Sequence, residues 1–87
     1  MLSDKSSFGD VLHELQEACE FLHAFSQGHR GFTRRDGLAG IRRGSDLCEH
    51  METHFASSTN AERVKTAVTS ARAHIAEAKA RLALFRG

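Results

Sequence analysis

The fold is decided by residues 59–85, TNAERVKTAVTSARAHIAEAKARLALF. Apolar residues recur here at alternating steps of four and three, in an unbroken heptad pattern: Val64, Val68, Ala71, Ile75, Ala78, Leu82 and Phe85. This pattern is typical of a helix that packs lengthwise on other helices. Thr59 and Glu62 fit a capping box at its start. We therefore expect a helix over about residues 60–86, about 40 Å long.

A second amphipathic stretch covers about residues 8–27. Ser7 and Asp10 fit a capping box, and Gly28 can take the left-handed conformation that ends a helix. The main apolar stripe consists of Phe8, Leu12, Leu15, Cys19 and Leu22. Further apolar residues lie to one side of it, namely Val11, Ala18, Phe21 and Phe25. The apolar arc of this helix is therefore wider than one neighbouring helix would cover.

The region between these stretches predicts a helix over about residues 35–57. Its apolar residues share one face: Leu38, Ile41, Cys48, Met51 and Phe55. Gly37, Gly40 and Gly44 each cost about 1 kcal/mol relative to alanine in a helix. They either break residues 33–44 into a turn or permit close approach of another backbone. We favour one helix that is weakened at its start.

These three stretches predict a single all-α domain over residues 1–87, with residues 1–6 frayed. The chain contains no proline to interrupt long helices. Short connections make consecutive helices antiparallel. The expected architecture is an antiparallel three-helix bundle or a helical hairpin with a long C-terminal helix.

Composition favours a cytoplasmic protein. No apolar run is long enough to span a bilayer, and residues 1–5 do not resemble a signal peptide. The two cysteines, Cys19 and Cys48, are too few for a disulfide-built domain, so we expect reduced, buried thiols.

Charged residues occur in alternating acidic and basic blocks, although the net charge is only +1. Two basic surfaces are expected, one from the Arg/Gly segment 28–44 and one from a ridge on the last helix: Arg30, Arg34, Arg35, Arg42 and Arg43, and Lys65, Arg72, Lys79 and Arg86. We expect the ridge to pair with acids of the first helix, in the same chain or in a second copy. The alternative function is association with nucleic acid through segment 28–44.

Histidines and cysteines suggest a third class of function, a metal or redox sensor. His50 and His54 are spaced so that both rings can reach one ion, and His13 and Glu17 share that spacing. All four point away from the apolar stripes of their helices, so we expect solvated side chains and no metal site. The cysteines lack a CxxC spacing, which favours a packing role.

No nucleophile elbow, phosphate-binding loop or zinc-protease motif is present, so we expect neither catalysis nor a cofactor. The preferred function is a small protein–protein interaction module, such as a regulator, inhibitor or chaperone-like adaptor. Its predicted partner-binding residues are Phe21 and Phe25, on the spare face of the first helix, and Leu84, beside the seam of the last. Two of the seven seam positions, Ala71 and Ala78, are small, and Phe21 and Phe25 give the first helix a spare apolar arc, so we also expect a homodimer that supplies the missing burial.

Overall fold

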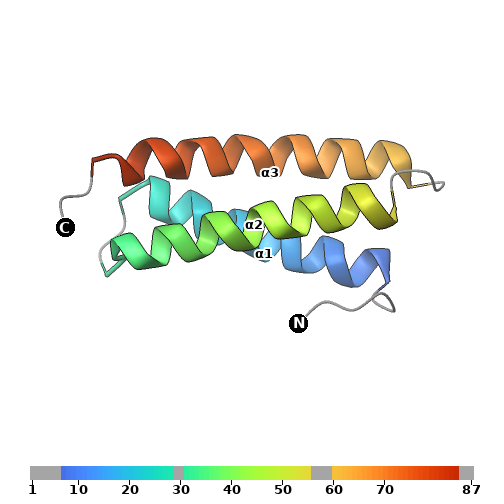
Figure 1. The fold of residues 1–87 in the computed structure, drawn as a ribbon, viewed down its shortest axis with the longest axis horizontal. Coiled ribbons are helices and arrows are strands. Elements are labelled where there is room, and N and C mark those ends of the chain that lie inside the picture. Colours follow the sequence, from blue (N-terminus) through green and yellow to red (C-terminus); the bar gives the residue numbers. More distant parts are fainter. Residues whose placement is uncertain (1–6, 29–30, 56–59, 85–87) are drawn as a thin grey trace.

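Three α-helices form the fold in the computed structural model, which describes residues 7–28, 31–55 and 60–84 (Figure 1). They are α1 (Phe8–Ser26), α2 (Arg34–His54) and α3 (Ala61–Leu82). α1 and α3 run in the same direction, α2 runs oppositely, and each helix packs against the other two. The predicted all-α three-helix bundle is confirmed, and the alternative of a two-helix hairpin is excluded.

Some predictions concern positions outside the described residues. They are the frayed segment 1–6, the capping residue Thr59, the last seam residue Phe85, and the basic residues Arg30 and Arg86. Within the three described segments, no helix is both long and apolar enough to cross a membrane.

The predicted seam of α3 lies in the core. Its first five members are at most 6% exposed: Val64, Val68, Ala71, Ile75 and Ala78. Leu82 packs at the edge of the same cluster and is partly buried. The heptad pattern therefore identified the buried face of α3 correctly.

The buried face of α1 differs from the predicted stripe. The residues that are at most 2% exposed are Val11, Leu15, Ala18, Leu22 and Phe25. Phe8, Leu12 and Cys19, which were predicted to be central, are only partly buried at the margin of the core. α1 is thus rotated about its axis, so that the side predicted to be spare faces its neighbours.

α2 is one continuous helix, as predicted, and it begins one residue earlier than expected. Thr33 and Asp36 form a complete capping box. The Thr33 amide donates to Asp36 Oδ2 at 2.8 Å, and the Asp36 amide donates to Thr33 Oγ1 at 3.2 Å. This reciprocal pair satisfies two backbone donors in the first turn and offsets the weak helix propensity of the glycines that follow.

The three glycines of α2 are buried where side chains of the other helices approach its backbone. A methyl group added at Gly40 would lie 2.7 Å from the ring of Phe21, and one added at Gly44 would lie 3.2 Å from Leu22. The ring of Phe25 occupies the equivalent space beside Gly37. Close approach was therefore the correct explanation, but side chains rather than a backbone make it.

Because the glycine face of α2 turns inward, Leu38 lies outside the core. It is 49% exposed, which contradicts its predicted place on the buried face. Ile41 and Phe55 are partly buried, whereas Cys48 and Met51 are fully buried.

The helix ends differ from prediction by a few residues. α1 ends at Ser26, and Gly28 takes the expected left-handed conformation with φ of 76°. α2 ends at His54 rather than at 57. α3 ends at Leu82 rather than at 86, because the Leu84 amide donates to the Arg81 carbonyl at 3.0 Å and tightens the last turn.

Candidate partner-binding groove

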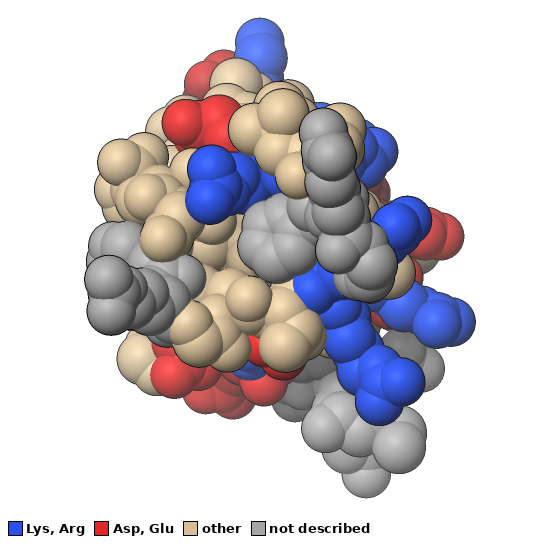
Figure 2. All heavy atoms as spheres, turned by 90° about the vertical axis from the view of Figure 1, so that its left-hand side faces the viewer, with Lys and Arg blue, Asp and Glu red and all other residues tan. Residues whose placement is uncertain are grey.

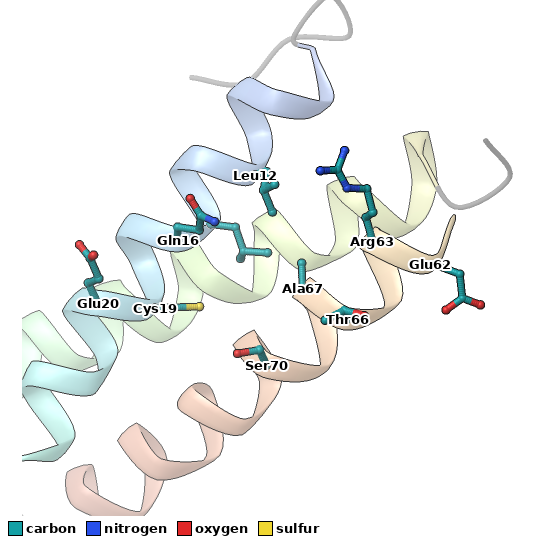
Figure 3. Close-up of a pocket in the computed structure, with 10 residues that line it drawn as sticks. Leu12, Gln16, Cys19, Glu20, Glu62, Arg63, Thr66, Ala67 and Ser70 are labelled. Carbon is teal, nitrogen blue, oxygen red and sulfur yellow. The ribbon is translucent and has the colours of Figure 1, made fainter. Parts of the chain in front are cut away.

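An open groove of about 700 Å³ runs between α1 and α3. Figure 3 shows α1 along one side of it and α3 along the other. Residues Leu12, Leu15, Gln16, Cys19 and Glu20 come from α1, and residues Glu62, Arg63, Thr66, Ala67 and Ser70 come from α3. We refer to it below as the α1–α3 groove.

The groove exists because the two facing helices differ in side-chain size. The rotation of α1 leaves Leu12 and Cys19 at the margin of the core, facing α3. On the opposite side, α3 presents Ala67, whose methyl group cannot fill the space between the helices. The result is an apolar floor that remains partly open to solvent.

The rim of the groove carries charge at both ends. Glu20 on α1 and Glu62 on α3 lie at opposite ends and on opposite sides, and their carboxylates are directed away from the space between the two helices (Figure 3). The guanidinium of Arg63 lies 5.8 Å from the centre of the Phe8 ring, in a cation–π contact. Phe8 also packs edge-on against Phe55 at 5.5 Å, so this end of the bundle holds Arg63 in place.

The two thiols occupy different environments and are not joined by a disulfide. Cys48 is fully buried, whereas Cys19 is partly buried and its sulfur points into the groove. Burial raises the pKa of both thiols above the ordinary value of 9.0. A nearby Arg72 partly opposes this shift in the pKa of Cys48. Neither thiol is therefore poised as a nucleophile.

Of the three predicted partner-binding residues, only Leu84 is well exposed, at 70%. The prediction that Phe25 lies on an exposed face is wrong, since it is fully buried against Gly37. Phe21 is partly buried, and it packs on Gly40 and edge-on against Phe32 at 5.1 Å. These rings fill space that the glycines of α2 leave open.

Two of the predicted basic residues form ion pairs between helices, on the surface of the bundle. Arg43 of α2 lies 3.7 Å from Glu14 and 3.9 Å from Glu17, both on α1. Arg72 of α3 lies 2.6 Å from Glu52 of α2. The ridge on α3 therefore meets an acid of α2 at this position, whereas the sequence had suggested the acids of α1.

Arg34, Arg35, Arg42, Lys65 and Lys79 are exposed. Figure 2 views the end of the bundle where α2 begins, and Lys and Arg side chains gather on one side of that end. The three arginines belong to the first half of α2, but no described aromatic ring is exposed beside them for stacking on bases.

Four of the described histidines contact each other in pairs: the ring centres of His50 and His54 lie 4.4 Å apart, and those of His23 and His74 lie 5.8 Å apart. His13 lies 3.8 Å from Glu17. Among the described residues, no three His, Cys, Asp or Glu side chains are grouped so that they could hold a metal ion.

Sequence reasoning missed the groove, although it had noted most of the relevant apolar residues. It assigned Leu12 and Cys19 to the centre of the core and gave no role to Gln16 or Glu20. The available signal was the second stripe on α1, which has the same spacing as the first.

Comparisons of this chain with protein-family models, with curated proteins and with solved structures find no match.

Proposed function

We propose that this protein is a small non-enzymatic interaction module that binds a helix of a partner protein in the α1–α3 groove. The observation that carries the proposal is the groove itself, an apolar floor already formed between two helices. An amphipathic helix that lays its apolar face into such a groove is a common mode of protein recognition. A regulator, an inhibitor or a chaperone-like adaptor would act in this way.

The dimensions of the groove support a helical occupant. Its α1 side extends from Leu12 to Glu20, which is about 12 Å or two helical turns. A smaller hollow follows on the same side of the bundle, between the end of α1 and the end of α3, and Leu84 lines it. A longer partner would therefore also reach Leu84, one of the residues expected from the sequence.

The chemistry of the groove favours binding over catalysis. Cys19 is its only thiol among the described residues, and burial raises the pKa of that thiol. A catalytic cysteine requires the opposite shift, because the thiolate is the nucleophile. The floor offers apolar contact, and the polar side chains stand at the rim, as in binding grooves.

Site-specific photo-crosslinking in extract of the native cell tests the proposal. A crosslinker replaces Thr66, which lines the groove, or Thr69, which is exposed on the same helix outside it. We expect a crosslinked protein at position 66 and little at position 69, with mass spectrometry identifying the contacted segment. Equal crosslinking at both positions would count against the groove.

A groove-filling variant completes the test. Ala67→Trp places an indole ring over the floor, and circular dichroism checks that the helices remain intact. The crosslink at position 66 should then disappear. If a folded Ala67→Trp protein captures the same partner equally well, the binding surface lies elsewhere.

A further inference from the structure

The geometry points to a cationic partner: an amphipathic helix with Lys or Arg on both flanks of its apolar face. This inference rests on the proposed function and goes further, because it names the chemistry of the occupant. It is carried by Glu20 and Glu62, the two acidic residues of the groove, whose carboxylates lie at its outer edges and point outward (Figure 3).

Neither carboxylate has a counter-ion in the part of the chain that the structure describes. Glu20 and Glu62 form no hydrogen bond or ion pair with any described residue. The cation at the rim, Arg63, is directed over the ring of Phe8. With two carboxylates and one guanidinium, the groove carries a net charge of about −1.

The other contacts between helices differ in this respect. Between α1 and α2, Glu14 and Glu17 pair with Arg43. Between α2 and α3, Glu52 pairs with Arg72. Each of these acids lies within ion-pair distance of an arginine, which Glu14 and Glu17 share, whereas Glu20 and Glu62 have no such neighbour among the described residues.

The positions of the carboxylates define the partner helix. They lie at opposite ends and on opposite sides of a groove that accommodates about two helical turns. An occupant would place apolar residues at i, i+3 or i+4, and i+7 against Leu12, Cys19 and Ala67. Lys or Arg near each end, on opposite flanks, would have to extend over the rim to reach the outward-pointing carboxylates of Glu20 and Glu62.

Charge argues against two other occupants. A second copy of this chain, paired groove to groove, would bring four carboxylates and only two arginines into one interface. A nucleic acid would present phosphates to the same carboxylates. Both arrangements are less favourable than a cationic helix.

Two designed peptides of about 14 residues test the inference, each stapled to hold a helix. They share one leucine face and differ only in their flanking residues, which are lysine in one and glutamate in the other. Fluorescence polarisation at low salt should give a Kd on the order of 10 μM for the lysine peptide and at least about tenfold weaker binding for the glutamate peptide.

Protection of Cys19 from a thiol reagent locates the bound peptide. The sulfur of Cys19 points into the groove, so the lysine peptide should slow its modification several-fold. If the peptide binds by fluorescence polarisation but does not slow the modification of Cys19, it binds elsewhere, and the inference is overturned.

Two charge variants with the same change in net charge separate local pairing from long-range attraction. The double variant Glu20→Gln with Glu62→Gln should raise the Kd of the lysine peptide about five- to tenfold. Asp46→Asn with Glu49→Gln neutralises two exposed acids of α2 outside the groove, and should change the Kd less than about twofold. Equal effects of the two double variants would overturn the inference.

The remaining outcomes distinguish this inference from the proposed function. Equal affinity for the two peptides overturns the cationic preference and leaves a helix-binding groove. If neither peptide binds, the inference is overturned, and crosslinking at position 66 still decides whether the groove binds a protein.

Discussion

The ring of Phe25 on α1 fills the space that a side chain at Gly37 of α2 would occupy. Phe25 is fully buried, so its ring has no room to move away. One turn earlier on α1, Phe21 stands in the same relation to Gly40 of α2. The contact between α1 and α2 is therefore built from large rings on one helix and glycines on the other.

Gly37→Ala should destabilise the protein by up to about 2 kcal/mol, although alanine is the better helix former. Overpacking a core costs about 1–3 kcal/mol, against about 1 kcal/mol gained from helix propensity. Urea denaturation measures the difference. Gly9→Ala is the matched control, since its added methyl would meet only Ser7 Oγ at 3.9 Å. A Gly37→Ala protein as stable as the wild type would show that Phe25 can move aside.

The sequence alone could not decide which face of α1 is buried. Leu15 and Leu22 belong to two stripes with identical spacing, one containing Leu12 and Cys19 and the other Ala18 and Phe25. The choice depends on what the facing helix offers, and α2 offers glycines that only large rings can cover. By helix propensity alone, these glycines only destabilise α2. In the folded protein they make room for Phe25, and the resulting orientation of α1 leaves the α1–α3 groove open.

The buried face of α3 was predictable because, unlike α1, it has a single heptad stripe of large apolar residues. Ile75→Asp should therefore unfold the domain, with a cost of several kcal/mol, because Ile75 is only 6% exposed and the carboxylate would have no partner. Ala76→Asp is the control, since Ala76 is exposed on the same turn. Circular dichroism should show lost helicity only for Ile75→Asp. If the Ile75→Asp variant has the same melting temperature as the wild type, Ile75 lies outside the core.

The two thiols should react with a thiol reagent at different rates in the native state. Cys19 borders the groove and should react faster than the fully buried Cys48. Burial raises the pKa of both thiols, so the fraction present as thiolate near pH 8 is smaller than for a free cysteine. The rate at which Cys19 is labelled should therefore still increase with pH above pH 9. Mass spectrometry of time points follows each site. Equal native rates would contradict the difference in burial.

Nucleic acid should bind weakly, and binding should disappear as salt rises. Arg43 and Arg72 are already paired with acids, which leaves Arg34, Arg35 and Arg42 as the exposed arginines of α2 without an ion pair among the described residues. A fluorescent oligonucleotide titrated at several salt concentrations measures this. Tight binding at physiological salt that is lost in Arg34→Ala with Arg35→Ala would instead support the nucleic-acid function.

The last prediction concerns self-association. The sequence predicted a homodimer, and the structure removes part of the evidence for it. That expectation relied on Phe21 and Phe25 as spare apolar surface, and Phe25 lies in the core. An open apolar surface that remains among the described residues is the α1–α3 groove, whose lining includes Glu20 and Glu62.

Two grooves that face each other would repel through these carboxylates, and salt would screen the repulsion. We therefore expect a monomeric mass at micromolar concentration and low salt, with any dimer becoming stronger as salt rises. Binding of a cationic helix should show the opposite salt dependence, because salt screens an attraction there. Sedimentation of the wild type and of Glu20→Gln with Glu62→Gln measures both effects. A stable dimer at low salt that the double variant leaves unchanged would show that the copies pair through another surface.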